Sequence, residues 1–191
     1  VYGLLGPNGS GKTTTMKIMT GLIHPDRGSI ELLGVDPLND IEGALKNVGC
    51  LIENPCFYPY LTARQNLALI QRFYPACTND HVRHILEDVG LADYQDEKTA
   101  KFSLGMKQRL GLAMTLLSEP ELIILDEPTN GLDIEGMADV RRIIRAQAEK
   151  GRTVLISSHL AGEIDQICTD LAILREGRVI ASSSIAALQQ V

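Results

Sequence analysis

The sequence predicts an α/β fold in which a mainly parallel sheet is flanked by helices, and two kinds of observation carry this prediction. Apolar runs of strand length recur along the chain, and segments with helical periodicity and capping residues lie between them. The 191 residues, of which 45% are hydrophobic, are enough for one α/β domain with a sizeable core. The net charge of −6 and the scattered basic residues argue against nucleic acid as the main partner.

The chain begins with an apolar strand, 1–5, which leads through a glycine-rich loop into a helix predicted over 12–21. This loop has the P-loop pattern, in which glycines let backbone N–H groups approach a polyphosphate. The lysine of the pattern reaches the β- and γ-phosphates, and its following threonine ligates Mg²⁺. The predicted ligand is a magnesium nucleoside triphosphate, and the strand and helix on either side disfavour a glycine-rich turn that binds nothing. The residues concerned are Gly6, Pro7, Asn8, Gly9, Ser10, Gly11, Lys12, Thr13 and Thr14.

Between this helix and the middle of the chain, we expect a short strand at 29–33, a helix at 41–46 and a buried strand at 48–52. Glu53 follows the last of these at the strand end where open α/β sheets bind ligands. The loop 54–61 then gathers aromatic and proline residues, although only 4% of the whole chain is aromatic. Such a cluster fits a docking surface or a piece of core.

The region after this loop reads as a helical insertion between sheet strands. Helices are predicted at 63–74, capped by Thr62, and at 81–89, capped by Asp80. Ser103 is placed to cap a further long helix that runs to residue 117. A helix start with a serine and a glycine is also a potential anion site, but a plain N-cap is the simpler interpretation.

Two carboxylates, Asp126 and Glu127, end the apolar strand 122–125. At a strand end, Asp126 can reach Mg²⁺ through water and Glu127 can orient or deprotonate a water molecule. A purely structural acid pair is the alternative, which the P-loop upstream disfavours. His159 follows another buried strand, 153–157, where contact with a γ-phosphate and a plain structural role are about equally well supported. A helix at 135–150, a hairpin from 171–174 to 178–181 and a short helix to the chain end complete the predicted elements.

The order of these motifs resembles the ATP-binding domain of ABC transporters over almost the whole chain. The resemblance implies a P-loop NTPase fold of one domain, 1–191, with a helical subdomain at about 62–118 that carries the signature motif. It assigns the Walker A motif to 6–14, the signature motif to 102–106, the Walker B motif to 122–127, the D-loop to 130–133 and the switch histidine to His159.

The family mechanism implies ATP and Mg²⁺ as cofactors, with Glu127 and His159 as catalytic residues. It also implies a second copy of the domain bound head to tail, so that Ser103 and Gly105, together with the D-loop residue Asp133, complete the ATP site of the partner. Hydrolysis then drives a separate transmembrane permease, which we expect to dock between Glu53 and Leu61 at the cytoplasmic face of the cell membrane. No nucleic acid is expected as a partner.

Two departures from the family pattern are informative. Most members have Gln where this chain has Glu53, and the signature reads FSLGM instead of LSGGQ. Both features look like the subgroup of bacitracin-resistance and lantibiotic-immunity exporters. We therefore expect an exporter of an antimicrobial peptide or similar amphipathic substrate, and we expect Glu53 to join Thr13 and Asp126 at the metal.

A third departure is that the chain starts after the strands that normally precede the Walker A motif, one of which stacks an aromatic residue on adenine. We therefore expect a fragment that lacks these N-terminal strands. A soluble ABC ATPase that acts as a nucleotide-driven clamp on ribosomes or DNA is the alternative function. The absence of tandem domains or a coiled-coil insertion counts against it. A regulatory module with little hydrolysis is disfavoured by Glu127 and His159.

Overall fold

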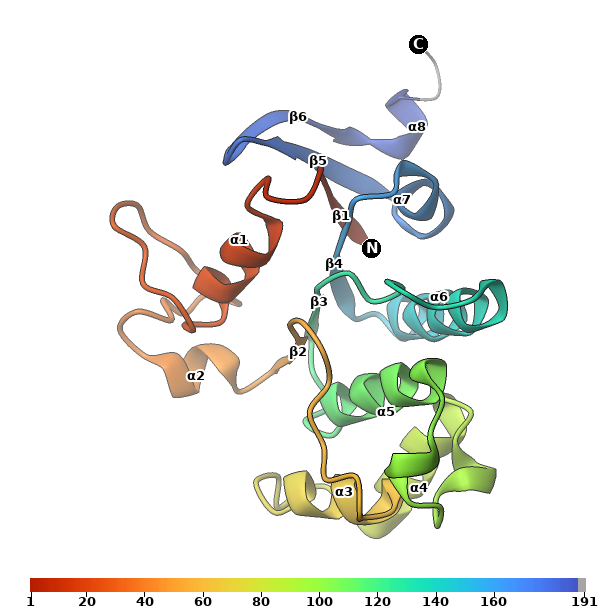
Figure 1. Cartoon of the computed structure of the whole chain (residues 1–191). Coiled ribbons are helices and arrows are strands. Elements are labelled where there is room, and N and C mark those ends of the chain that lie inside the picture. Colours follow the sequence, from red (N-terminus) through yellow and green to blue (C-terminus); the bar gives the residue numbers. More distant parts are fainter. Residues whose placement is uncertain (189–191) are drawn as a thin grey trace.

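The computed structural model describes residues 1–188, in which a six-stranded sheet carries helices on both faces (Figure 1). The strands lie in the order β2-β3-β4-β1-β5-β6, and every neighbouring pair is parallel except β5 and β6. The predicted α/β fold with a mainly parallel sheet is therefore confirmed. The strands are β1 (Tyr2–Leu5), β2 (Val48–Leu51), β3 (Leu122–Leu125), β4 (Thr153–Ser158), β5 (Asp170–Arg175) and β6 (Arg178–Ser184).

The helices divide between the two faces of the sheet. In Figure 1, α1 and α2 lie on one side, α5, α6 and α7 lie on the other, and α3 and α4 lie beyond α5. Two short 3₁₀ turns, Ala92–Tyr94 and Thr99–Lys101, join α4 to α5. The helices are α1 (Lys12–Met19), α2 (Ile41–Leu45), α3 (Ala63–Gln71), α4 (Asn79–Asp88), α5 (Leu104–Leu116), α6 (Ile134–Glu149), α7 (Ala161–Ile167) and α8 (Ile185–Leu188).

The continuous apolar run of β3 shows why the sheet is covered on both faces. Successive strand side chains point to opposite faces. Leu122 and Ile124 pack with Met16 of α1 on one side, whereas Ile123 and Leu125 belong to the larger core on the side of α5 and α6. All four strand residues are buried. A parallel strand with two covered faces needs this unbroken apolar sequence.

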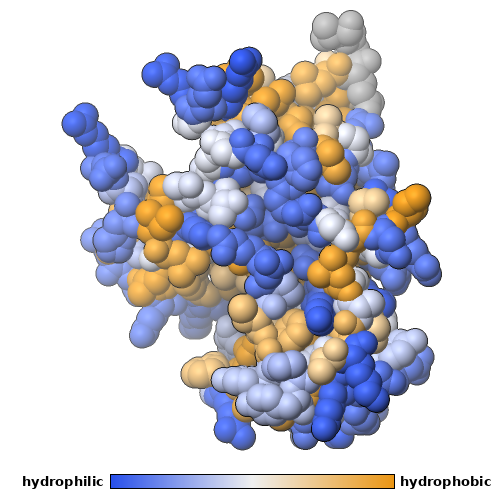
Figure 2. Space-filling model, in the orientation of Figure 1, coloured by the Kyte–Doolittle hydropathy of each residue, from blue (hydrophilic) through white to orange (hydrophobic). Residues whose placement is uncertain are grey.

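The strand predicted at 29–33 is wrong. Only one isolated antiparallel bridge forms there, between Leu32 and Val35. A strand needs a neighbour that supplies a hydrogen-bonding ladder, and none of the described strands lies beside this segment. Figure 2 shows apolar surface at the left of the view, over the α1 and α2 region, where Leu22, Leu33 and Ile41 are exposed.

The helical region is stabilised by caps, most of which the sequence predicted. Thr62 accepts a hydrogen bond from the backbone N–H of Gln65, whose side chain accepts from the Thr62 N–H, so the two form a complete capping box. Ser103 caps α5 by accepting from the N–H of Met106. For α4 the predicted cap, Asp80, is wrong because Thr78 lies in the extended conformation and caps the helix instead.

The end of the described chain forms the predicted hairpin. Strands β5 and β6 pair up to Arg175 and Arg178, which leaves Glu176 and Gly177 as a two-residue turn. Both turn residues have positive φ, 51° and 73°, as the turn type with the right twist for a hairpin requires. Helix α8 follows, and the predicted continuation of this helix to the chain end lies outside the described residues. Helix α7, between β4 and β5, was not predicted.

Candidate nucleotide-binding site

The residues predicted to carry the chemistry meet where three neighbouring strands end. Strands β3, β4 and β1 are adjacent and parallel, so their carboxyl ends lie at one edge of the sheet. The P-loop follows β1, Asp126 and Glu127 follow β3, and His159 follows β4. This edge is where open α/β sheets place their ligand sites.

The P-loop is held between the sheet and the hairpin. The N–H of Gly6 donates to the carbonyl of Ser158 at 3.2 Å, and the N–H of Gly177 donates to the carbonyl of Ser10 at 3.0 Å. A side chain at Gly6 would collide with the Leu174 carbonyl, which lies 2.4 Å from the position of its Cβ. Gly11 has φ of 104°, a backbone conformation that other residues rarely adopt. The two glycines are therefore required by the loop itself.

The N-terminus of α1 has no side-chain cap, whereas α2 to α6 are each capped by an Asp, Ser or Thr side chain. The first backbone N–H groups of a helix have no partner within the helix, and they carry the positive end of its dipole. The Ser10 hydroxyl is also buried, and it lacks a hydrogen-bond partner in the described part of the chain. Both features fit a bound phosphate group.

Lys12 is buried against its own loop and against an acid from β3. Its ammonium donates to the carbonyls of Gly6 at 2.7 Å and Pro7 at 3.3 Å. It also forms an ion pair of 3.2 Å with Oε1 of Glu127. Only 5% of Lys12 is exposed. A charged group this deeply buried needs such partners, so Lys12 and Glu127 depend on each other in this state.

Glu127 also contacts the histidine that follows β4. Its Oε2 lies 2.8 Å from Nδ1 of His159. Glu127, two residues after the end of β3, adopts positive φ, 47°, a conformation that is uncommon for a glutamate. Strain of this kind often marks functional sites. The carboxylate of Glu127 therefore links Lys12 to His159 across two strand ends.

Asp126 is fixed by hydroxyl groups on either side. Its Oδ2 accepts from Thr13 Oγ1 at 2.7 Å, and its Oδ1 accepts from Ser157 Oγ at 2.6 Å. Neighbouring oxygen ligands around an octahedral Mg²⁺ lie about 2.9 Å apart. The hydroxyl of Thr13 and the carboxylate of Asp126 are therefore the right donors at the right spacing for a hydrated Mg²⁺.

Ser157 was missed as a site residue by the sequence reasoning. Its side chain is fully buried, and its Oγ accepts from the N–H of Glu127 at 2.8 Å while it donates to Asp126. One hydroxyl thus fixes both acids. The available signal was the pair of serines at the end of a buried apolar strand, because a hydroxyl in such a place needs polar partners.

Glu53 does not join this cluster in the structure. Its side chain is 61% exposed and forms an ion pair of 2.6 Å with Lys17 of α1. Its backbone has positive φ, 64°, two residues after the end of β2. The structure thus gives Glu53 a basic partner and no described bond to Thr13 or Asp126.

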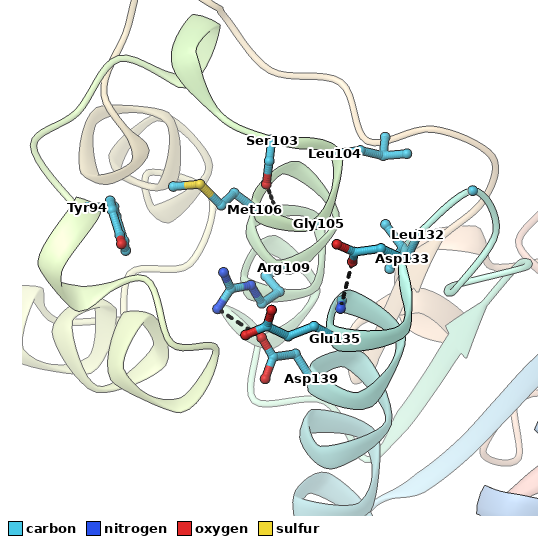
Figure 3. Close-up of a pocket in the computed structure, with 12 residues that line it drawn as sticks. Tyr94, Ser103, Leu104, Gly105, Met106, Arg109, Leu132, Asp133, Glu135 and Asp139 are labelled. Atoms are coloured by element: carbon cyan, nitrogen blue, oxygen red, sulfur yellow. Dashed lines mark hydrogen bonds and ion pairs between the residues drawn. The ribbon is translucent and has the colours of Figure 1, made fainter.

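A pocket of about 450 Å³ is lined by Ser103, Gly105 and Asp133, among other residues (Figure 3). It opens between the starts of α5 and α6, and none of its lining residues comes from the P-loop. Arg109 crosses the pocket and lies 3.5 Å from Asp139. The structure therefore brings the predicted signature and D-loop residues together. They lie apart from the strand-edge cluster, which consists of Lys12, Thr13, Asp126, Glu127 and His159.

Ser103 and Asp133 each cap a helix of this chain, whereas the packing around Gly105 does not require a glycine at that position. Ser103 caps α5 and Asp133 caps α6 by accepting from the N–H of Gly136. A Cβ at Gly105 would meet no atom closer than 3.9 Å. Glycine within a helix costs about 1 kcal/mol relative to alanine. The described part of the chain leaves room for an alanine at position 105, so packing does not account for the glycine.

The loop 54–61 contributes one aromatic side chain to the core and two to the surface. Phe57 packs against the main core, whereas Tyr58 and Tyr60 are 52% and 64% exposed. The two tyrosine rings lie 5.7 Å apart and tilted. Among residues 1–188, no helix is both long and apolar enough to cross a membrane.

The fold and the strand-edge cluster define a P-loop NTPase of the α/β type. A profile described as ABC transporter matches residues 1–130, and the chain belongs to the ABC transporter family. The structure of cbiO1 from Clostridium perfringens, described as part of the ABC transporter complex cbiONQ, superposes with a TM-score of 0.87 at 26% identity. The match covers 99% of this chain and 78% of cbiO1.

Among relatives, the bacitracin transport ATP-binding protein BcrA of Bacillus licheniformis is 44% identical over 94% of this chain and 59% of its own length. The lantibiotic transport ATP-binding protein SrtF of Streptococcus pyogenes is 40% identical over 94% of this chain and 77% of its own length. The predicted resemblance to the bacitracin and lantibiotic subgroup is therefore confirmed. The chain spans about three fifths of the length of several curated relatives that it matches.

Proposed function

We propose that this chain binds and hydrolyses ATP with Mg²⁺ as the nucleotide-binding subunit of an ABC exporter. The observation that carries the proposal is the strand-edge cluster, in which Lys12 contacts Glu127 and Thr13 contacts Asp126. The uncapped start of α1 and the buried, unpartnered Ser10 hydroxyl support phosphate binding at residues 6–14.

Each group in the cluster has a distinct role in this proposal. Lys12 neutralises phosphate charge, and Thr13 and Asp126 hold Mg²⁺ directly or through water. The metal ion supplies charge neutralisation at the phosphate oxygens. Glu127 accepts a proton from the attacking water or orients it, and His159 contacts the γ-phosphate. Glu53 reaches the metal only after it leaves Lys17.

Gly105 supports a second copy of the chain as partner. The open space at this glycine lets a phosphate group approach the backbone at the start of α5, because no described atom lies closer than 3.9 Å to the position of a Cβ there. Ser103 and Asp133 line the same pocket. A head-to-tail dimer would bring this surface to the P-loop of the other copy. The test is whether the purified protein dimerises when ATP is added.

The names of the relatives support a proposal about the substrate and the membrane partner. BcrA and SrtF are named as transport proteins for bacitracin and for a lantibiotic, and cbiO1 belongs to a transporter complex. We therefore propose export of an antimicrobial peptide or a similar amphipathic molecule through a separate permease. The permease docks on the loop between Glu53 and Leu61, where Tyr58 and Tyr60 are exposed, at the cytoplasmic face of the membrane.

The test has two stages, of which the first concerns ATP. The purified protein should hydrolyse ATP in the presence of Mg²⁺, and Lys12→Ala should lower ATP affinity by at least about tenfold. Lys46→Ala is the matched control because this exposed lysine is the C-cap residue of α2 and is not one of the residues of the strand-edge cluster. Equal ATP affinity of Lys12→Ala and the parent protein would remove the P-loop from its proposed role.

The second stage concerns transport. The protein is purified with the membrane protein encoded beside its gene, both are placed in lipid vesicles, and ATP hydrolysis is measured with bacitracin or a lantibiotic. Stimulation that disappears in Lys12→Ala supports a peptide exporter. Stimulation by ribosomes or DNA in place of peptides would show the soluble clamp instead.

A further inference from the structure

Glu163 is a buried acid without a role in the site described so far. It lies in the first turn of α7 and is only 8% exposed. None of the ion pairs of the described residues includes it, and its Oε1 is buried without a hydrogen-bond partner there. A buried carboxylate without a basic partner is costly to fold. Such a group calls for an explanation.

Among residues 1–188, the one side-chain hydrogen-bond partner of Glu163 is Ser158, the residue before His159. Its Oε2 accepts from Ser158 Oγ at 2.8 Å, and this hydrogen bond is buried. The same hydroxyl accepts from the N–H of Leu160 at 3.0 Å. The two bonds therefore enclose His159 between residues that are both tied to Glu163.

This arrangement is a capping box with an extra member. A Glu at the third position of a helix usually accepts directly from the backbone N–H of the N-cap residue. Here the N-cap is Leu160, which has no side-chain acceptor. Ser158 therefore relays the bond from the Leu160 N–H to Glu163. The direction in which the chain leaves β4 and enters α7 depends on this relay.

Ser158 is in turn fixed to the P-loop and the sheet. Its carbonyl accepts from the N–H of Gly6, and its Cα is in register with Leu5 of β1. The relay thus sets His159 at a fixed place relative to both the P-loop and Glu127, whose Oε2 is 2.8 Å from His159 Nδ1.

We propose that Glu163 is a positioning residue that, through Ser158, holds His159 in contact with Glu127. The proposal rests on the proposed function of Glu127 and His159 in ATP hydrolysis. If Glu163 only stabilised α7, its substitution would lower the melting temperature and leave turnover by the folded protein unchanged.

The test compares Glu163→Ala, Glu163→Gln and the control Ile167→Ala. The glutamine keeps an oxygen that can accept from Ser158, whereas Ile167 packs in the main core at the other end of α7. We expect Glu163→Ala to lower kcat by about tenfold or more, with ATP affinity within about twofold of the parent protein. Glu163→Gln should keep at least about half of kcat. Ile167→Ala should lower the melting temperature but not kcat.

A kcat of Glu163→Ala within about twofold of the parent protein would overturn the proposal, as would a glutamine variant as slow as the alanine variant. Ser158→Ala provides the same test if Glu163→Ala does not fold, and the double variant should be no slower than either single variant.

A readout independent of hydrolysis separates this inference from the proposed function. The imidazole chemical shifts of His159 at fixed pH should move in Glu163→Ala and stay in place in Glu163→Gln. A parent protein without ATP hydrolysis would refute the proposed function, while unchanged shifts in Glu163→Ala would refute the positioning role.

Discussion

Ser157→Ala tests whether one buried hydroxyl fixes both acids of the site. The substitution leaves the N–H of Glu127 and Oδ1 of Asp126 without their hydrogen-bond partner, and these two bonds are partly buried and buried, respectively. Each buried group left unpaired costs about 1–3 kcal/mol, so we expect a total loss of about 3 kcal/mol. For a chain of 191 residues, this loss lowers the melting temperature by roughly 6–12 °C.

The assay combines thermal unfolding with ATP hydrolysis measured well below the melting temperature of the variant. We expect kcat to fall by about tenfold because both acids lose their fixed orientation. Thr115→Val is the matched control, since its buried hydroxyl donates only to the carbonyl of Leu112 within its own helix. A Ser157→Ala melting temperature within about 2 °C of the parent value would refute this reasoning.

Three further predictions follow from single groups. Glu127→Gln should keep ATP binding and lower turnover by at least about tenfold, as measured by nucleotide binding and steady-state hydrolysis. Lys17→Ala should change the free energy of unfolding by less than about 1 kcal/mol because the ion pair with Glu53 is exposed. Lys17→Ala should also lower the Mg²⁺ concentration that gives half-maximal hydrolysis. When Glu53→Gln is combined with Lys17→Ala, this decrease should disappear. Burial raises the pKa of the Cys168 thiol to about 12. The folded state therefore holds the proton more tightly, and stability should fall between about pH 9 and 12 in urea unfolding, less steeply in Cys168→Ala.

Local chemistry explains which parts of the fold were predictable from the sequence. The strand at 122–125 was predictable because a short, unbroken apolar run is typical of a parallel strand that is covered on both faces. The hairpin around Glu176 and Gly177 was predictable because its turn is formed by neighbours in the sequence. Helix α7 was missed because its N-cap, Leu160, has no capping side chain and the relay through Ser158 is visible only in three dimensions. The strand at 29–33 was overpredicted because pairing partners cannot be read from one segment.

The same distinction applies to the site. Lys12 and Glu127 were predicted as site residues because each lies in a short motif at the end of an apolar strand, and parallel strands end at the same edge. The sequence could not show that these two residues form an ion pair with each other. Nor could it show that Lys17 holds Glu53, because the two residues are 36 positions apart and neither belongs to a recognised pair.

In the proposed reaction, the contacts of Lys12 connect phosphate binding to the position of Glu127. The ammonium of Lys12 donates to two carbonyls and forms an ion pair with Glu127, so a phosphate that binds Lys12 competes with that carboxylate. A phosphate group is an anion, as is the carboxylate of Glu127, so it can take the place of this carboxylate beside Lys12. Arrival of a phosphate would therefore release Glu127 from Lys12 and leave it with His159 alone. Loss of the charge at residue 127 would remove this competition. Glu127→Gln should then bind ATP more tightly than the parent protein while it hydrolyses ATP more slowly, two effects of opposite sign from one substitution.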